Sequence, residues 1–153
     1  MNQKASVGKG PQTSKGAQEP AGTPKRILLV DDHPGVRETV ARIIGREPDL
    51  VVCGEAGNAE QAVAAIARLQ PDLVLLDLAL PGKSGLDLVK ELRATGHRLK
   101  VLVASLNDPA IYGHVALRAG ANGYFGKQGR PEDLIRAIRE VLAGRLYLSH
   151  RAR

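Results

Sequence analysis

The sequence has few aromatic residues and a single cysteine. Phe, Trp and Tyr make up only 3% of its 153 residues, and Trp is absent. A buried core must therefore be built from Leu, Val, Ile and Ala, which a hydrophobic fraction of 43% allows. The one cysteine, Cys53, excludes a disulfide within the chain, and we expect it to be a buried apolar residue in a reducing compartment.

Long apolar runs are also missing. Stretches such as 27–30 and 73–76 are far shorter than the roughly 20 residues that span a bilayer. No apolar block follows Lys4, Lys9 and Lys15, as it would in a secretory signal. We therefore expect a cytoplasmic protein with no membrane partner. A length of 153 residues excludes two large domains.

The net charge of +6 is concentrated near the N-terminus. Residues 1–26 hold five basic residues and one acidic residue, whereas the remainder holds 17 and 15. Residues 1–24 are rich in Gly, Pro, Ser, Thr, Gln and Lys, and they offer too little apolar surface to offset the entropy of ordering. We predict a disordered basic tail over 1–24. Its scattered lysines favour this interpretation over an arm that binds nucleic acid or lipid.

From residue 26 onward, short apolar strands alternate with helical patterns. Strands are predicted at 27–30, 51–53, 73–76, 101–103 and 123–125. A helix is expected after each strand, with start signals at Asn58, Ser84, Asp108-Pro109 and Pro131. Because wholly apolar strands need both faces of their sheet covered, the pattern predicts a parallel, doubly wound α/β sheet.

Polar residues follow four of the predicted strands at the point where each strand ends. They are Asp31, Asp32, Asp77, Ser105 and Lys127. In a doubly wound sheet these side chains meet at one edge, where ligands bind. Close carboxylates repel one another, and Mg²⁺ removes that conflict because it prefers oxygen ligands. A carboxylate can also attack phosphorus, with Lys127 supplying positive charge and Ser105 a hydrogen bond.

Each of these residues alone has an ordinary explanation as a loop, cap or turn residue. Their occurrence together, in this order at the strand ends, is what indicates a functional site. The segments ILLVDDHP (27–34), PDLVLLDL (71–78), LPGKSG (80–85), VAS (103–105) and GANGYFGK (120–127) occur in register. They resemble the receiver domain of two-component response regulators over about residues 25–147. The resemblance implies a flavodoxin-like (βα)₅ fold with a five-stranded parallel sheet in the order 2-1-3-4-5.

The resemblance also implies chemical roles. Asp77 looks like the phosphoacceptor, and Asp31 and Asp32 look like the acidic pair that holds Mg²⁺ directly or through water. The backbone carbonyl of Ala79 is a further expected Mg²⁺ ligand. His33 follows the acidic pair, and we interpret it as the cap of the first helix because Mg²⁺ does not favour imidazole.

The remaining implied roles concern switching. Lys127 looks like the phosphate-binding lysine, Ser105 like the switch hydroxyl and Tyr124 like the aromatic switch residue. Phosphorylation is expected to shift a surface made by the fourth helix, the fifth strand and the fifth helix. The fourth helix contains Gly113 and has the weakest apolar stripe, so we predict that it is the least stable helix.

The opening DDHP (31–34) and the ending YLS (147–149) look most like the NarL/LuxR-type subfamily. Its members usually continue into a DNA-binding helix-turn-helix. We therefore expect a sensor histidine kinase as phosphodonor, a possible homodimer through the switching surface or another face, and DNA contact only through an output domain. Residues 148–153 are interpreted as a linker remnant, and the chain as a fragment. A stand-alone receiver is the alternative.

Two other function classes compete with a phosphorylated receiver. A phosphatase with an aspartyl nucleophile usually carries a second Asp two residues later, where this chain has Ala79, so we expect no enzyme beyond self-catalysed phosphotransfer and autodephosphorylation. An interaction module with an unused acidic pocket would fail to bind Mg²⁺. A dinucleotide-binding domain is disfavoured because no glycine fingerprint follows the first strand.

Overall fold

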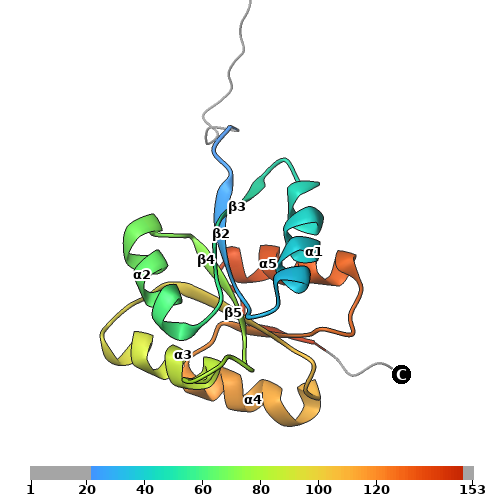
Figure 1. Cartoon of the computed structure of the whole chain (residues 1–153). Helices are drawn as coiled ribbons and strands as arrows, with labels where there is room; N and C mark the ends of the chain where they lie inside the picture. Colours follow the sequence, from blue (N-terminus) through green and yellow to red (C-terminus); the bar gives the residue numbers. More distant parts are fainter. Residues whose placement is uncertain (1–21, 150–153) are drawn as a thin grey trace, which may run out of the picture.

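The computed structural model describes residues 22–149, and Figure 1 shows the arrangement of their helices and strands. The strands are β2 (Lys25–Val30), β3 (Leu50–Ala56), β4 (Leu73–Asp77), β5 (Lys100–Ser105), β6 (Gly123–Gly126) and β7 (Tyr147–Leu148). The helices are α1 (Pro34–Gly45), α2 (Ala59–Leu69), α3 (Gly85–Ala94), α4 (Pro109–Ala119) and α5 (Pro131–Leu142). Most of the tail predicted to be disordered, up to residue 21, lies outside the described residues, as do residues 150–153.

The strands form one sheet in the order β3-β2-β4-β5-β6-β7, and every neighbouring pair is parallel. The first five strands of this order correspond to the predicted order 2-1-3-4-5, which is confirmed. The sixth strand, β7, was not predicted, because two residues leave no periodic signal in the sequence. It extends the sheet beside β6, with Tyr147 opposite Gly123 and Leu148 opposite Tyr124.

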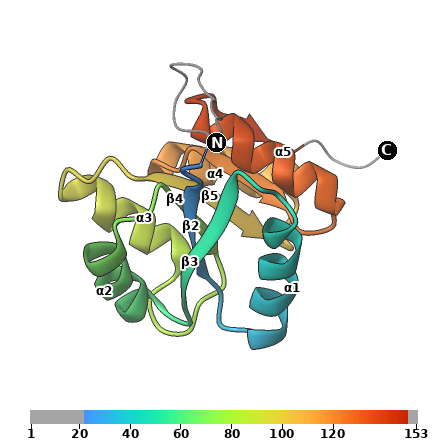
Figure 2. The ribbon, with the colours of Figure 1, turned by 90° about the horizontal axis from the view of Figure 1, so that it is seen from above.

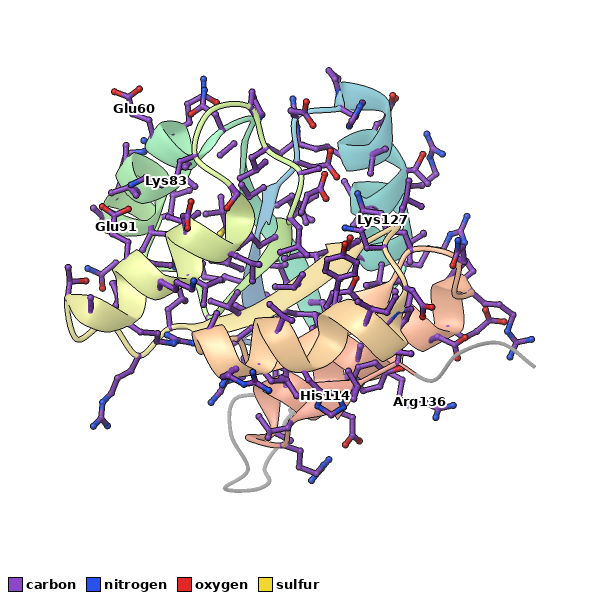
Figure 3. The ribbon with its side chains drawn as sticks, turned by 90° about the horizontal axis from the view of Figure 1, so that it is seen from below. Glu60, Lys83, Glu91, His114, Lys127 and Arg136 are labelled. Carbon is purple, nitrogen blue, oxygen red and sulfur yellow. The ribbon has the colours of Figure 1, made fainter. Side chains whose placement is uncertain are left out.

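Helices cover both faces of the sheet, as the apolar strands require. Alternate residues of each strand contribute to two separate cores, one on each side of the sheet. Figures 1 and 2 show the helices on the two sides of the sheet, and Figure 3 shows the side chains that the ribbons carry. One core joins Leu28, Val74 and Val103 to α2, α3 and α4, and the other joins Leu29 and Leu75 to α1 and α5. The carboxyl ends of the strands and the first turns of the helices therefore meet at the same edge.

The predicted start signals of three helices form hydrogen bonds. Asn58 Oδ1 accepts a bond of 2.8 Å from the Gln61 N–H, and Ser84 Oγ accepts one of 3.2 Å from the Asp87 N–H. Asp108 Oδ1 accepts a bond of 2.9 Å from the Ala110 N–H. Caps of this kind typically stabilise a helix by about 1 kcal/mol. These bonds set where α2, α3 and α4 begin after the strand ends.

Cys53 differs from its expected burial, and Gly113 makes a contact that the sequence did not predict. Cys53 is only half-buried, because β3 is an edge strand with one neighbour, and burial raises the pKa of its thiol. Gly113 has a packing role in α4, because a Cβ there would clash with the Cδ1 atom of Leu148 in β7. Among the helices of residues 22–149, none is long and apolar enough to cross a membrane.

Candidate functional site

The acidic residues predicted at the strand ends lie together. β2 and β4 are neighbours, with Val30 opposite Leu76, so Asp31 and Asp77 extend from adjacent strands. One ligand atom from each of Asp31, Asp32, His33 and Asp77 lies within 4.8 Å of the others. The structure thus brings all three carboxylates to one point at the edge of the sheet.

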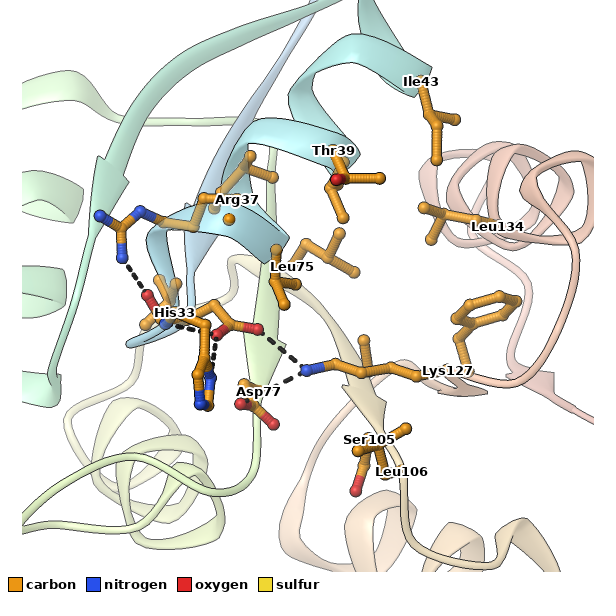
Figure 4. Close-up of a pocket in the computed structure, with 18 of the residues that line it drawn as sticks. His33, Arg37, Thr39, Ile43, Leu75, Asp77, Ser105, Leu106, Lys127 and Leu134 are labelled. Carbon is orange, nitrogen blue, oxygen red and sulfur yellow. Dashed lines mark hydrogen bonds and ion pairs between the residues drawn. The ribbon is translucent and has the colours of Figure 1, made fainter.

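Lys127 reaches the same point from the end of β6. Its Nζ atom lies 2.9 Å from Asp31 Oδ2 and 3.4 Å from Asp77 Oδ2 (Figure 4). The side chains of Asp31 and Asp77 are 10% and 6% exposed, so water screens these interactions only weakly. The Lys127 N–H also donates to the Ser105 carbonyl at 2.7 Å, which fixes the lysine against the end of β5.

The two buried carboxyls differ in pKa. Burial raises the pKa of Asp77, and the opposing charge of Lys127 and the Ala79 N–H do not cancel this effect, so the net pKa is above its ordinary value. Burial also opposes ionisation of Asp31, but hydrogen bonds from Lys127 and His33 outweigh it and lower the pKa. Lys127 therefore stabilises the Asp31 carboxylate more than that of Asp77.

The donor set fits a hard divalent cation. Asp32 Oδ1 is buried and accepts no hydrogen bond, although the His33 Nδ1 atom lies 3.0 Å away. A buried carboxylate oxygen without a hydrogen bond is costly unless a cation or water satisfies it. Three carboxylates beside one lysine also leave an excess of negative charge. Asp31, Asp32 and Asp77 are therefore suited to hold Mg²⁺, which takes oxygen ligands.

Ala79 was predicted to supply a backbone carbonyl. It lines the same cavity as the carboxylates, and its N–H donates to Asp77 Oδ1 at 3.2 Å. This bond holds the Asp77 carboxylate against the loop that follows β4. A metal-binding role for the Ala79 carbonyl stays a prediction.

His33 occupies the N-cap position of α1, but its side chain makes no capping hydrogen bond. Its Nδ1 atom instead lies 3.2 Å from Asp31 Oδ1 and 3.0 Å from Asp32 Oδ1. The interpretation of the side chain as a helix cap was therefore wrong. The two carboxylates attract the imidazole more strongly than the first N–H groups of the helix do.

Ser105 and Tyr124 meet at one residue, Asn107. Ser105 Oγ accepts a hydrogen bond of 3.0 Å from the Asn107 N–H, and the Tyr124 hydroxyl donates one of 2.8 Å to the Asn107 carbonyl. Tyr124 is fully buried and Ser105 is 3% exposed. Burial raises the pKa of the Tyr124 phenol. The loop between β5 and α4 is thus bonded to both predicted switch residues.

Asp31, Asp77 and Lys127 line one end of a cavity of 1020 Å³. From there the cavity continues between α1 and α5, where Val40, Ile43 and Leu134 line it. The cavity therefore has a polar end next to an apolar flank.

Gly85 and Arg37, to which the sequence analysis assigned no role, support the site. Gly85 opens α3, and a Cβ there would lie 2.5 Å from the Asp77 carbonyl oxygen, so only glycine fits without displacing backbone. Arg37 donates from Nη1 to the Asp31 carbonyl and from Nε to Glu55 Oε1, the latter at 2.8 Å. The position of Arg37 one helical turn after the acidic pair was the available signal for its role.

Comparison with known proteins agrees with this geometry. Residues 27–139 match the family model described as the response regulator receiver domain. The nitrate/nitrite response regulator protein NarL of Escherichia coli K12 is 42% identical over 132 residues, which cover 86% of this chain and 59% of that protein. The DNA-binding transcriptional activator DevR/DosR of Mycobacterium tuberculosis is 37% identical over 83% of this chain and 58% of its own length.

Solved structures give the same result. A LuxR-family two-component response regulator from Aurantimonas sp. SI85-9A1 has a TM-score of 0.77 and 38% identity, and the match covers 83% of this chain and 91% of that one. The signal receiver domain of the putative regulator NarL from M. tuberculosis has a TM-score of 0.75 and 30% identity, covering 80% and 99%. This chain spans about three-fifths of the curated relatives it matches. It belongs to the response regulator receiver domain family and is similar to regulators of the NarL/LuxR type.

Proposed function

We propose that residues 25–147 are a phosphoacceptor receiver domain in which Asp77 takes a phosphoryl group from a histidine kinase. The observation that carries the proposal is the placement of Lys127 Nζ within 3.4 Å of both Asp31 and Asp77, at the edge of the sheet where the cavity opens. The proposal goes beyond family membership, because it assigns a role to each of these side chains.

The chemistry of transfer follows from the side chains. An Asp77 oxygen attacks phosphorus, the bond from phosphorus to the donor histidine breaks, and an acyl phosphate forms on Asp77. Lys127 is already beside the carboxylate and would neutralise the charge that the phosphoryl group brings. Ser105 lines the same cavity and would donate a hydrogen bond to a phosphoryl oxygen.

Asp31, Asp32 and Asp77 would hold Mg²⁺, with the Ala79 carbonyl as a further proposed ligand. When bound, the metal supplies positive charge to the phosphoryl oxygens and relieves the repulsion among the carboxylates. Lys127, in turn, keeps Asp31 ionised in the metal-free protein, since its hydrogen bond helps to hold the pKa of that carboxyl below the ordinary value.

The signal would leave through the surface formed by α4, β6 and α5. If Ser105 turns toward the phosphoryl group, its bond to the Asn107 N–H is lost, and the Tyr124 bond to the same residue must adjust. The relatives NarL and DevR/DosR are named as a response regulator and a DNA-binding transcriptional activator. Their names support an output that controls transcription through a DNA-binding domain, with dimerisation of the receiver as a possible step.

The test is phosphorylation by acetyl phosphate in the presence of Mg²⁺, followed by intact-mass spectrometry. Wild-type protein is expected to gain one phosphoryl group, and the Asp77→Asn variant none, because an amide oxygen is a poor nucleophile. Asp87→Asn, which changes an exposed acidic residue of α3, is the matched control and should label like wild type. Undiminished labelling of Asp77→Asn would contradict the assignment.

The phosphatase alternative is tested in the same samples. Sustained hydrolysis of a small phosphate ester by wild-type protein, in many turnovers per molecule, would favour it over a receiver. We expect a single labelling event followed by slow loss of the phosphoryl group.

A further inference from the structure

Arg37 connects α1, the end of β3 and the loop after β2 that holds Asp31 and Asp32. Arg37 is the fourth residue of α1, and its side chain is only 19% exposed. Its Nε atom donates to Glu55 Oε1, near the end of β3, at 2.8 Å. Its Nη1 atom donates to the backbone carbonyl of Asp31, just past the end of β2. In Figure 4 the dashed lines from Arg37 and Lys127 reach the acidic loop from opposite sides.

The carbonyl that Arg37 binds has a particular position in the chain. It belongs to the peptide group that joins Asp31 to Asp32, so its orientation constrains the backbone from which both carboxylates project. The N–H of Asp31 is itself held by the Ala56 carbonyl at 3.0 Å. The Asp31 N–H is therefore bonded directly to Ala56 of β3. The Asp31 carbonyl is linked through Arg37 to Glu55, the residue before Ala56.

These hydrogen bonds oppose the repulsion among the carboxylates when no metal is bound. Asp31, Asp32 and Asp77 repel one another, and the repulsion favours rotation of the loop away from the site. Asp32 Oδ1 accepts no hydrogen bond in its present position, although His33 Nδ1 lies 3.0 Å away. A contact to the backbone between Asp31 and Asp32 adds to the side-chain contacts from Lys127 and His33 that hold the two carboxylates before a cation binds.

We propose that Arg37, oriented by Glu55, is a positioning residue that presets the Asp31–Asp32 loop for Mg²⁺. This inference rests on the proposed function, since it assumes that these carboxylates bind the metal. Arginine suits the task because its planar guanidinium can bind a carboxylate and a carbonyl at the same time in fixed directions. Lysine presents a single ammonium and cannot reproduce both contacts in that geometry.

The first experiment is calorimetric titration of the full chain with MgCl₂. The Arg37→Gln variant is expected to bind Mg²⁺ about 10-fold more weakly than wild type, the low end for residues that orient metal ligands. Arg37→Lys should fall between the two, and Glu55→Gln should weaken binding by a smaller factor than Arg37→Gln. Adding Glu55→Gln to Arg37→Gln should cause little further loss, because Glu55 acts through Arg37.

The matched control is Glu38→Gln. Glu38 lies on the same helix and pairs with Arg42 at 3.9 Å, but both side chains are largely exposed and away from the loop. Its removal changes the charge of α1 in the same way as Glu55→Gln changes that of β3. Mg²⁺ affinity should stay at the wild-type value.

A second readout separates positioning from simple destabilisation. The rate of labelling by phosphoramidate is measured against Mg²⁺ concentration, with circular dichroism to establish the folded fraction. Positioning predicts that Arg37→Gln raises the half-saturating Mg²⁺ concentration and leaves the maximal rate near that of wild type. A role in folding alone would lower the amplitude and leave the half-saturating concentration unchanged, which would overturn the proposal.

The outcomes also separate this proposal from the proposed function. If wild-type protein binds Mg²⁺ and Arg37→Gln binds it equally tightly, the positioning role is wrong and the receiver function stands. If wild-type protein binds no Mg²⁺ at millimolar concentration, both are wrong. If Arg37→Gln does not fold, Arg37→Lys and Glu55→Gln decide, and wild-type affinity in both would overturn the proposal.

Discussion

Lys127 contacts two of the three carboxylates, Asp31 and Asp77, and it stabilises their ionised forms to different extents. It lies 2.9 Å from Asp31 and 3.4 Å from Asp77. The shorter contact accompanies the lowered pKa of Asp31, whereas burial dominates at Asp77 and raises its pKa. The metal-free site therefore holds one well-stabilised carboxylate and one that opposes folding when it is ionised.

This difference predicts how Asp77→Asn changes stability with pH. A carboxyl whose pKa rises on folding stabilises the fold fully below its unfolded pKa and loses that contribution as pH rises through the folded pKa. At pH 7 without Mg²⁺, Asp77→Asn should therefore have a higher free energy of unfolding in urea than wild type. The difference should shrink as pH falls through the raised folded pKa and should be gone below about pH 4, where the unfolded carboxyl is also protonated.

The contribution of Asp31 to stability has the opposite dependence on pH. Its lowered pKa means that its contribution is present above the unfolded pKa and is lost as pH falls through the folded pKa. Wild-type protein should thus lose stability on acidification below about pH 4, after Asp77→Asn has already lost its advantage over wild type at higher pH. Asp87→Asn is the control, and a lower stability of Asp77→Asn at pH 7 would contradict the account of the site.

The short strand β7 connects the switching surface to the end of the described chain. The Ser149 N–H donates to the Tyr124 carbonyl at 2.9 Å, and Ser149 Oγ accepts from the Gly126 N–H at 3.0 Å. Leu148 lies against Gly113 of α4. Residues 147–149 are therefore paired with β6, bonded to it on both sides of Phe125 and packed against α4, so they link the positions of α4 and β6.

The contact between Leu148 and Gly113 can be tested with a double-mutant cycle. Gly113→Ala should destabilise the protein by about 1 kcal/mol, because the new methyl group forces Leu148 to move. In the Leu148→Ala background the same change should stabilise the protein, since alanine is favoured over glycine inside a helix by up to about 1 kcal/mol. Urea unfolding of the four variants measures the coupling. Equal effects in both backgrounds would mean that the contact does not determine stability.

For the chain taken together, the acidic edge links folding to metal binding. Three carboxylates and one lysine leave an excess of negative charge that only the folded state concentrates in one place. A cation that binds there, and not to the unfolded chain, stabilises the fold by mass action. Stability is therefore expected to depend on Mg²⁺ as well as on pH.

Addition of MgCl₂ at 100 times its dissociation constant should raise the free energy of unfolding by about 2.7 kcal/mol. Removal of the metal with a chelator should reverse the effect. Asp32→Asn should lower the gain, because it removes the carboxylate oxygen that is buried without a hydrogen bond. Sodium chloride at equal ionic strength is the control for screening. A shift no larger with MgCl₂ than with sodium chloride would argue against a specific site.

Much of the fold follows from short-range patterns. The first five strands, the caps at Asn58 and Ser84, and the start of α4 at Pro109 depend on residues within one or two helical turns of each other. The convergence of Asp31, Asp77 and Lys127 was also predictable, because parallel strands place their carboxyl ends at one edge.

Other features depend on contacts between distant segments, and periodicity carries no information about them. Arg37 and Glu55 are 18 positions apart, and their pairing depends on how α1 packs beside β3. The ring of His33 faces carboxylates instead of the helix, and Leu148 meets Gly113 only because β7 joins the sheet. Local sequence therefore specifies which elements form and where their polar ends lie. Side-chain directions and long-range pairs are settled when the helices and the sheet pack together, because burial, repulsion and hydrogen bonding must then be satisfied at once.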